Sequence, residues 1–282
     1  MMLQTYTDLT IEDLLNGDLQ LATLPAIYFE LTKVLDDPNT SVADVARIID
    51  KDANLSLKLL KLVNSAFFGF PSQISSIDRA INLIGRKDIE NLVLSTILID
   101  KFSSLPGNII SMHDFWSRSL RCALLAREIC LLVSTPNKLD ANTLFICGLL
   151  HDIGQLVFFR RIPELAREIT MLTLDSTADE TDVETRLLGF DHFDTGAELV
   201  KLWKLPQIIV DSIQQHEHPE YDGDYNIEAT IVRSANQLCK MNTSNCLFQL
   251  ASLGIAEEDV EIAINKMLDE FEDIFKLFFP TY

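Results

Sequence analysis

The sequence predicts an all-α fold, and three observations support that prediction. Apolar residues recur every three or four positions along nearly every segment, which is the period of an amphipathic helix. Alternating strand patterns are nearly absent. Residues that start or stop helices flank the periodic segments, as Ser41 and Gly85 do. With 282 residues, 48% of them apolar, the chain can bury a large core as one domain or as two packed sub-domains.

The first half of the chain divides into five predicted helices, over residues 23–35, 42–49, 55–69, 77–84 and 87–102. Pro25 is tolerated in the first turn of the first helix. Ser41 and Asp44 have the spacing of a capping box for the second, and Ser76 caps the fourth. Residues 103–108 are a linker candidate. We therefore expect an amino-terminal helical bundle over 1–105, with a short leader over 1–20, and a second helical sub-domain over 106–282.

The second half is also expected to be helical, over residues 115–132, 141–157, 163–174, 195–203, 206–216 and 227–241. Residues 175–184 carry five acids and no base, which indicates a solvated loop that leads into a helix. A last helix places apolar residues from Val260 to Phe278 at four-three spacing. Core packing is the favoured interpretation of this seam, and a coiled-coil dimer is the alternative. The oligomeric state stays open.

Charge and cysteine usage exclude several classes of protein. The formal net charge of −19 repels phosphate backbones and anionic lipid, so neither nucleic acid nor a membrane surface is an expected partner. Five cysteines without a C-x-x-C pair indicate reduced core thiols. The first residues lack a secretory signal, and the best apolar run, Leu92 to Ile99, is too short to span a membrane. We expect a soluble, cytoplasmic protein.

Histidine carries the most conspicuous chemistry in the sequence, which has no phosphate-binding glycine loop and no nucleophile elbow. His151 and Asp152 interrupt an apolar helix, and His192 and His216 lie at predicted helix ends. Imidazole with carboxylate suits iron, manganese or zinc, so these four residues are candidate metal ligands. The alternative is a buried hydrogen-bond network that fixes the fold. A second pair, His113 with Asp114, is expected to cap the helix near Phe115.

Several sequence blocks together resemble the HDOD family, the HD-related output domain of bacterial signalling proteins. They are Asn-Ser-Ala-Phe-Phe-Gly at 64–69, Ile-Ser-Ser-Ile at 74–77, and Cys-Gly-Leu-Leu-His-Asp-Ile-Gly at 147–154. The resemblance covers roughly residues 20 to 240. It implies an amino-terminal helical bundle packed on a degenerate HD sub-domain, acting as an output or adaptor near two-component or cyclic-di-GMP pathways. From the residues themselves, we expect Asn64 and Ser65 to close the third helix through side-chain hydrogen bonds.

The resemblance also allows a test for hydrolase activity. Active HD hydrolases use an early His, the His-Asp pair and a late Asp as metal ligands. The early position corresponds to Arg118, whose guanidinium has no lone pair for a metal, and the late one to Asn236, which brings no charge. The degenerate HD site therefore comprises Arg118, His151, Asp152 and Asn236. We expect Arg118 to replace the metal by an ion pair with Asp152.

The sequence thus predicts a non-catalytic regulatory module without a cofactor, which acts on signalling proteins through protein contacts. One alternative is a metal-dependent phosphohydrolase acting on a cyclic dinucleotide or nucleotide. It rests on residual binding of iron, manganese or zinc by His151, Asp152, His192 and His216, whose spacing is similar to that of the cyclic-di-GMP phosphodiesterase branch. A nucleotide sensor without turnover is a third reading, which the charge of −19 disfavours.

Overall fold

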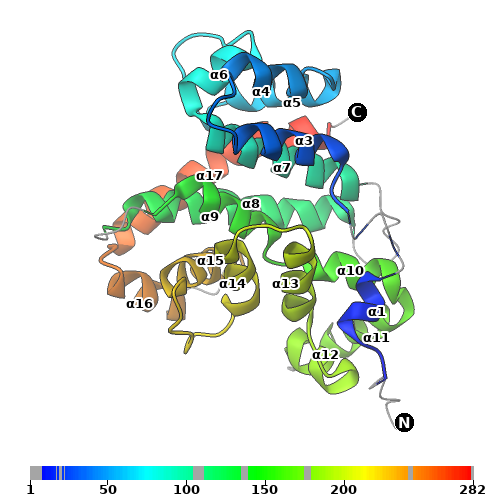
Figure 1. Ribbon diagram of the computed structural model, residues 1–282. Coiled ribbons are helices and arrows are strands. Elements are labelled where there is room, and N and C mark those ends of the chain that lie inside the picture. Colours follow the sequence, from blue (N-terminus) through cyan, green and yellow to red (C-terminus); the bar gives the residue numbers. More distant parts are fainter. Residues whose placement is uncertain are drawn as a thin grey trace.

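The computed structural model describes residues 8–280 apart from 17, 19, 20, 22, 104–110, 135–138, 175–178 and 241–243. All regular structure in these residues is helical, which confirms the all-α prediction. Figure 1 shows a smaller upper group of helices above a larger lower group, whose long helices α8 and α17 lie nearest the upper group.

The upper group comes from the first half of the chain: α3 (Ala26–Leu35), α4 (Val42–Ile49), α5 (Ala53–Val63), α6 (Ile77–Ile84) and α7 (Arg86–Phe102). A short helix, α1 (Ile11–Leu15), instead contacts helices of the lower group. That group begins with α8 (Met112–Leu132), α9 (Ala141–Leu150), α10 (Ile153–Arg161), α11 (Pro163–Leu174) and α12 (Glu180–Leu188). It continues with α13 (His192–Leu202), α14 (Gln207–Gln215), α15 (Asn226–Cys239), α16 (Ser244–Ser252) and α17 (Glu257–Phe278).

Local signals in the first half act as the sequence predicts. Ser41 and Asp44 form the capping box of α4. The third helix is shorter than expected, because α5 ends at Val63 and the chain turns at Asn64. The Asn64 amide donates to the carbonyl oxygens of Leu60 (2.6 Å) and Ile74 (2.8 Å) and accepts from the Ile74 amide (2.7 Å). The expected closure of this helix by side-chain hydrogen bonds is confirmed.

The loop after α5 docks the upper group on the lower one. The buried Phe67 ring lies 5.6 Å from the ring of Phe145 on α9, and the guanidinium of Arg127 on α8 lies 4.0 Å from the Phe67 ring centre. The α17 helix packs on both α8 and α5, and its apolar seam is largely buried. The seam therefore serves the core within the chain. Residues 104–108 of the predicted linker lie outside the described residues.

The predicted helix over 141–157 is broken at the His-Asp pair. The α9 helix ends at Leu150 and α10 begins at Ile153, with Asp152 at the turn between them. The stretch Ala141–Arg161 passes a length and hydropathy test for a membrane span, but 89% of its apolar window is buried inside the fold. It is therefore a buried core segment of the fold.

Two glycines allow the close helix packing that positions the break. A Cβ atom at Gly148 would lie 2.8 Å from the Ala123 Cα on α8, and one at Gly154 would lie 1.8 Å from the His192 carbonyl oxygen. Backbone contact at these distances leaves no room for a side chain. The contact at Gly154 brings the first turn of α10 against the first turn of α13, so that Asp152 and His192 meet.

We predict that Gly154→Ala lowers the free energy of unfolding by about 3 kcal/mol, because the added methyl group forces α10 away from α13. Gly254→Ala is the comparison, since Gly254 has φ +81° and open space around it, and should cost only about 1 kcal/mol of backbone strain. Urea unfolding of both variants measures the two values. Equal losses would show that the close approach at Gly154 is not limiting.

Candidate functional site

A chain of four buried side chains forms the centre of the site. Glu184 on α12 accepts two hydrogen bonds through Oε2, from the His192 amide (2.9 Å) and from His192 Nδ1 (2.6 Å). The Nε2 atom of His192 lies 3.7 Å from Asp152 Oδ1. On the other side of Asp152, His151 Nε2 lies 3.1 Å from Oδ2. His151 is anchored by its Nδ1 atom, which donates to the Gly148 carbonyl oxygen at 2.8 Å.

The charges of these four side chains stabilise one another, and all four side chains are buried. Burial alone would lower the pKa of His192, but the carboxylates of Glu184 and Asp152 hold it well above the usual histidine value. Burial alone would raise the pKa of Asp152, but the positive charge and hydrogen bond of His151, together with His192 at 3.7 Å, hold it well below its usual range. His192 is therefore an imidazolium placed between two carboxylates.

His216, at the end of α14, stays neutral beside these four side chains. Burial and the charge of His151 lower its pKa to about 3. Its Nδ1 donates to the Ile213 carbonyl oxygen at 2.9 Å, and its Nε2 is buried without a hydrogen-bond partner. The Phe193 ring lies 4.1 Å from the His192 ring and 4.5 Å from the His216 ring, so a phenyl group contacts both imidazoles.

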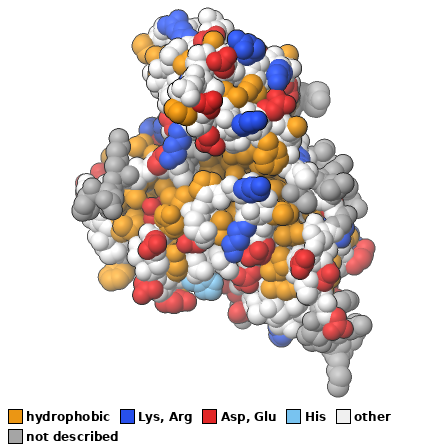
Figure 2. Space-filling model, viewed as in Figure 1, with side chains coloured by type: hydrophobic (Ala, Val, Ile, Leu, Met, Phe, Trp, Pro, Cys, Tyr) orange, Lys and Arg blue, Asp and Glu red, His pale blue; other side chains and the backbone are white. Residues whose placement is uncertain are grey.

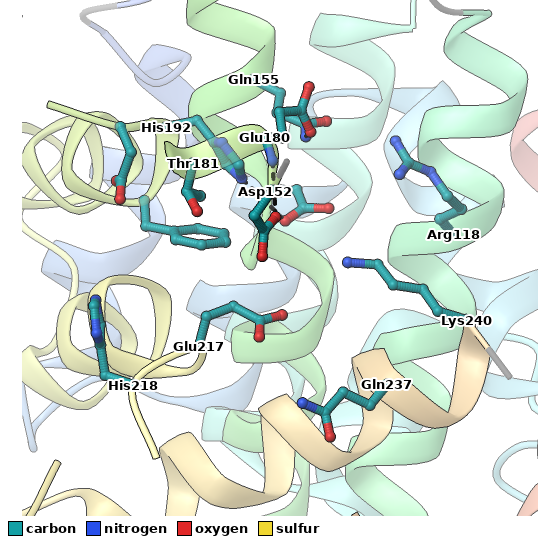
Figure 3. A pocket seen from close by; sticks show the side chains of 13 residues that line it. Arg118, Asp152, Gln155, Glu180, Thr181, His192, Glu217, His218, Gln237 and Lys240 are labelled. Carbon is teal, nitrogen blue, oxygen red and sulfur yellow. Dashed lines mark hydrogen bonds and ion pairs between the residues drawn. The ribbon is translucent and has the colours of Figure 1, made fainter. Parts of the chain in front are cut away.

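A pocket of about 560 Å³ opens beside the chain of buried residues. Five carboxylates, two cations, three other polar side chains, two histidines and a phenylalanine ring line it: Asp152, Asp179, Glu180, Asp191, Glu217, Arg118, Lys240, Gln155, Gln237, Thr181, His192, His218 and Phe193. Figure 3 shows Arg118 and Lys240 extending from one side of the pocket, with Asp152 near its centre and Glu217 below. The pocket is therefore acidic with a basic side.

The expected ion pair between Arg118 and Asp152 is wrong. Arg118 is exposed at the edge of the pocket and forms no ion pair with a described residue. Its positive charge acts instead on Glu180. Burial raises the pKa of Glu180, and the charge of Arg118 partly lowers it. Asp152 is instead compensated by His151 and His192, which approach it from adjacent helix ends.

Asn236 lies at the same site but points to a different acid. Its amide nitrogen donates to Glu217 Oε1 at 3.0 Å. Glu217 in turn lines the pocket, and burial raises its pKa. The expected cap by His113 and Asp114 is wrong, because Ser111 caps α8 by accepting from the Asp114 amide. Serine is among the preferred residues at the N-cap position, because its hydroxyl accepts a hydrogen bond from a backbone amide of the first turn.

The residues described here do not fit a metal ion as they are arranged. In favour of a metal, His151, His192 and His216 each commit Nδ1 to a fixed acceptor, which is how metal-binding imidazoles are oriented. However, the Nε2 atoms of His151 and His192 face Asp152, and the Phe193 ring contacts His192 and His216. No group of three or more His, Cys, Asp or Glu within the described ranges is placed to hold a metal.

Sequence reasoning missed the residue that fixes His192. Glu184 lies in the acidic stretch 175–184, which was expected to be a loop, whereas α12 begins at Glu180. Its signal was the apolar spacing of Val183, Leu187 and Leu188, which places Glu184 on a buried face. Lys240 was also missed, because a single lysine at a helix end carries no pattern.

These features define a class of protein: all-helical, with a His-Asp pair at a helix break beside a polar pocket. The family is shown by a model of the HDOD domain, which matches residues 21–219. The chain belongs to the HDOD family.

Relatives and solved structures agree with this assignment. An uncharacterized protein of Treponema pallidum is 26% identical over 219 residues, which is 76% of this chain and 41% of that protein. The uncharacterized protein YuxH of Bacillus subtilis is 28% identical over 178 residues, 62% of this chain and 39% of its own length. The chain thus spans about two fifths of the curated relatives it matches.

Among solved structures, a proposed phosphohydrolase of Shewanella amazonensis has a TM-score of 0.73 at 24% identity, covering 93% of this chain and 99% of that one. An HDOD domain protein of unknown function from Geobacter sulfurreducens has a TM-score of 0.72 at 21% identity, with 92% and 93% covered. A proposed signal transduction protein of Marinobacter aquaeolei has a TM-score of 0.72 at 20% identity, with 91% and 58% covered. At these identities the likeness shows the fold.

We predict that removing the charge of Glu184 destabilises the protein strongly, whereas removing the charge of Arg118 has almost no effect. Glu184→Ala should cost about 3 to 5 kcal/mol, because it leaves a buried imidazolium and a backbone amide without their acceptor. Arg118→Ala should change stability by less than about 0.5 kcal/mol, because the side chain is exposed and unpaired. Urea unfolding near neutral pH measures both. A large loss of stability in the Arg118 variant would contradict this prediction and would indicate an ion pair between Arg118 and Asp152.

Proposed function

We propose that the protein is a non-catalytic regulatory module of bacterial signal transduction, acting in the cytoplasm through protein contacts. One observation carries the proposal: the His-Asp centre is satisfied by its own side chains. Asp152 is held by His151 and His192, and His192 is held by Glu184. A carboxylate and two imidazoles committed to one another stabilise the fold and are not free to activate water.

The comparisons support a signalling role at a coarser level. The chain is an HDOD domain, and one similar structure is named as a proposed signal transduction protein. The expected partners are components of two-component or cyclic-di-GMP pathways. Nucleic acid and membranes are not expected partners, because the charge is −19.

The molecular surface offers a region suited to protein contacts. Figure 2 shows hydrophobic side chains gathered in a band below the upper group of helices, at the junction with the lower group. Basic side chains are frequent on the upper group in this view, and acidic ones are more frequent on the lower. Apolar surface bordered by charges of both signs is typical of regulated protein interfaces. We infer a platform to which both halves of the chain contribute.

The alternative function is a metal-dependent phosphohydrolase acting on a cyclic dinucleotide or nucleotide. The observation in its favour is the orientation of three imidazoles by their Nδ1 hydrogen bonds. Against it stand the guanidinium at position 118 and the amide at position 236, which is bonded to Glu217. The first residue brings a positive charge to the pocket, and the second is already engaged.

We predict that the purified protein contains substoichiometric iron, manganese and zinc and does not hydrolyse cyclic-di-GMP when these metals are added. Metal analysis by mass spectrometry and a phosphodiesterase assay measure the two properties. Asp152→Asn is the matched control, because it removes one ligand charge and keeps the side-chain shape. Metal-stimulated turnover that is lost in this variant would establish the hydrolase instead.

We also predict that cross-linking of the full chain to a captured signalling partner yields links from both halves of the protein. Proximity labelling in the bacterial host identifies the partner, and mass spectrometry locates the linked residues. Links are expected from the bundle over residues 26–102 and from residues beyond 111. Links confined to residues beyond 111 would remove the amino-terminal bundle from the proposed platform.

A further inference from the structure

The pocket beside the His-Asp centre has a chemistry that the regulatory proposal does not use. Its lining carries carboxylates from four separate segments, including Glu180 on α12 and Glu217 after α14. Its outer side carries two exposed cations, Arg118 on α8 and Lys240 at the end of α15. These two helices pack against each other, and Figure 3 shows both cations on the same side of the pocket.

Two amide oxygens in the pocket wall lack a donor. Gln155 is only 4% exposed, and its Nε2 donates to Glu180 Oε2 at 3.0 Å, while its Oε1 has no hydrogen-bond partner. The Oε1 of Gln237, across the pocket on α15, is also buried and unpartnered. Buried acceptors are normally paired in folded proteins. A ligand that brings several hydrogen-bond donors would supply the missing partners.

We propose that this pocket binds a small zwitterion, with a guanidinium or ammonium group held by Glu180 and the Gln155 oxygen, and a carboxylate held by Arg118 and Lys240. A guanidinium provides five donors in a plane, which suits a carboxylate and an amide oxygen side by side. The volume of about 560 Å³ is ample for an amino acid with a long basic side chain.

Other ligand charges fit the pocket less well. A dianionic phosphate would meet five carboxylates with only two cations to balance them. A polyamine would match the acidic part but would place positive charge beside Arg118 and Lys240, which have no ion pair with a described residue. Burial raises the pKa values of Glu180, Asp191 and Glu217, so an added cation would stabilise their charged forms. A zwitterion satisfies both sides at once.

The test uses three probes that share one carbon skeleton. L-arginine carries both charged ends, agmatine lacks the carboxylate, and L-citrulline replaces the guanidinium by a neutral ureido group. Isothermal titration of the full chain should give a dissociation constant for L-arginine of about 10 μM to 1 mM. Agmatine and L-citrulline should each bind about tenfold more weakly or worse, since each loses one charged contact.

Variants then assign each end of the probe to its residues. Glu180→Gln should weaken L-arginine and agmatine alike, whereas Arg118→Ala with Lys240→Ala should weaken L-arginine and leave agmatine unchanged or tighter. Gln155→Met, which removes the unpartnered oxygen and keeps the length, should weaken both cationic probes. Glu272→Gln on α17, an exposed acid outside the pocket lining, is the control and should change nothing. Circular dichroism checks that each variant is folded.

Three results would overturn the proposal. The first is no binding of L-arginine at concentrations well above the expected range. The second is agmatine binding as tightly as L-arginine in the native chain, which would mean a site for cations alone. The third is L-arginine binding that survives both the Glu180 variant and the double variant, which would place it elsewhere. None of these results bears on metal-stimulated hydrolysis or on protein capture, so the proposed function stands or fails separately.

Discussion

The buried carboxylate of Asp152 is the constraint on which the rest of this structure depends. An ionised carboxylate that is 4% exposed is stable only if positive charge and donors surround it. His151 and His192 supply them, and Glu184 in turn orients and stabilises the His192 imidazolium. The network requires four side chains from the α9–α10 break, α12 and α13 to meet, each 2.6 to 3.7 Å from the next. The arrangement of the lower helices follows from that requirement.

Two glycines allow the helices to pack closely enough for this network to form. Gly148 lets α9 approach α8, and Gly154 lets α10 touch the backbone of α13 at His192. Any larger residue at position 154 would separate Asp152 from His192. The break between α9 and α10 places Asp152 at a turn, directly before the close contact of Gly154 with the His192 backbone. The network and the backbone contact support each other.

Much of the fold could be predicted from periodicity and capping residues, because those signals are local. The α4 and α6 helices have the predicted bounds and caps, and α17 packs its apolar seam as core. The helix break at His151 could not be predicted, since it depends on a tertiary contact at Gly154. The site residues were recognised by type, but their pairing was not. The pairing of Arg118 with Asp152 is predicted from charge and from the neighbouring helices that the HD resemblance implies, whereas the actual partner depends on which helix ends converge. The role of Glu184 could not be predicted, because the helix that carries it begins within an acidic stretch.

The buried His-Asp centre and the neighbouring pocket differ in how their charges and hydrogen-bonding groups are paired. At the centre, Asp152 and His192 are nearly buried and lie between His151 and Glu184, so their charges are compensated within the protein. The pocket is open in the chemical sense, because Gln155 Oε1 and Gln237 Oε1 lack donors, and Arg118 and Lys240 form no ion pair with described residues. Replacing a metal-binding histidine by arginine at position 118 would both remove a ligand and add a fixed positive charge at the edge of the pocket. Under the functions proposed above, the residue type at position 118 thus disfavours metal chemistry at the centre and favours recognition of an anionic group beside it.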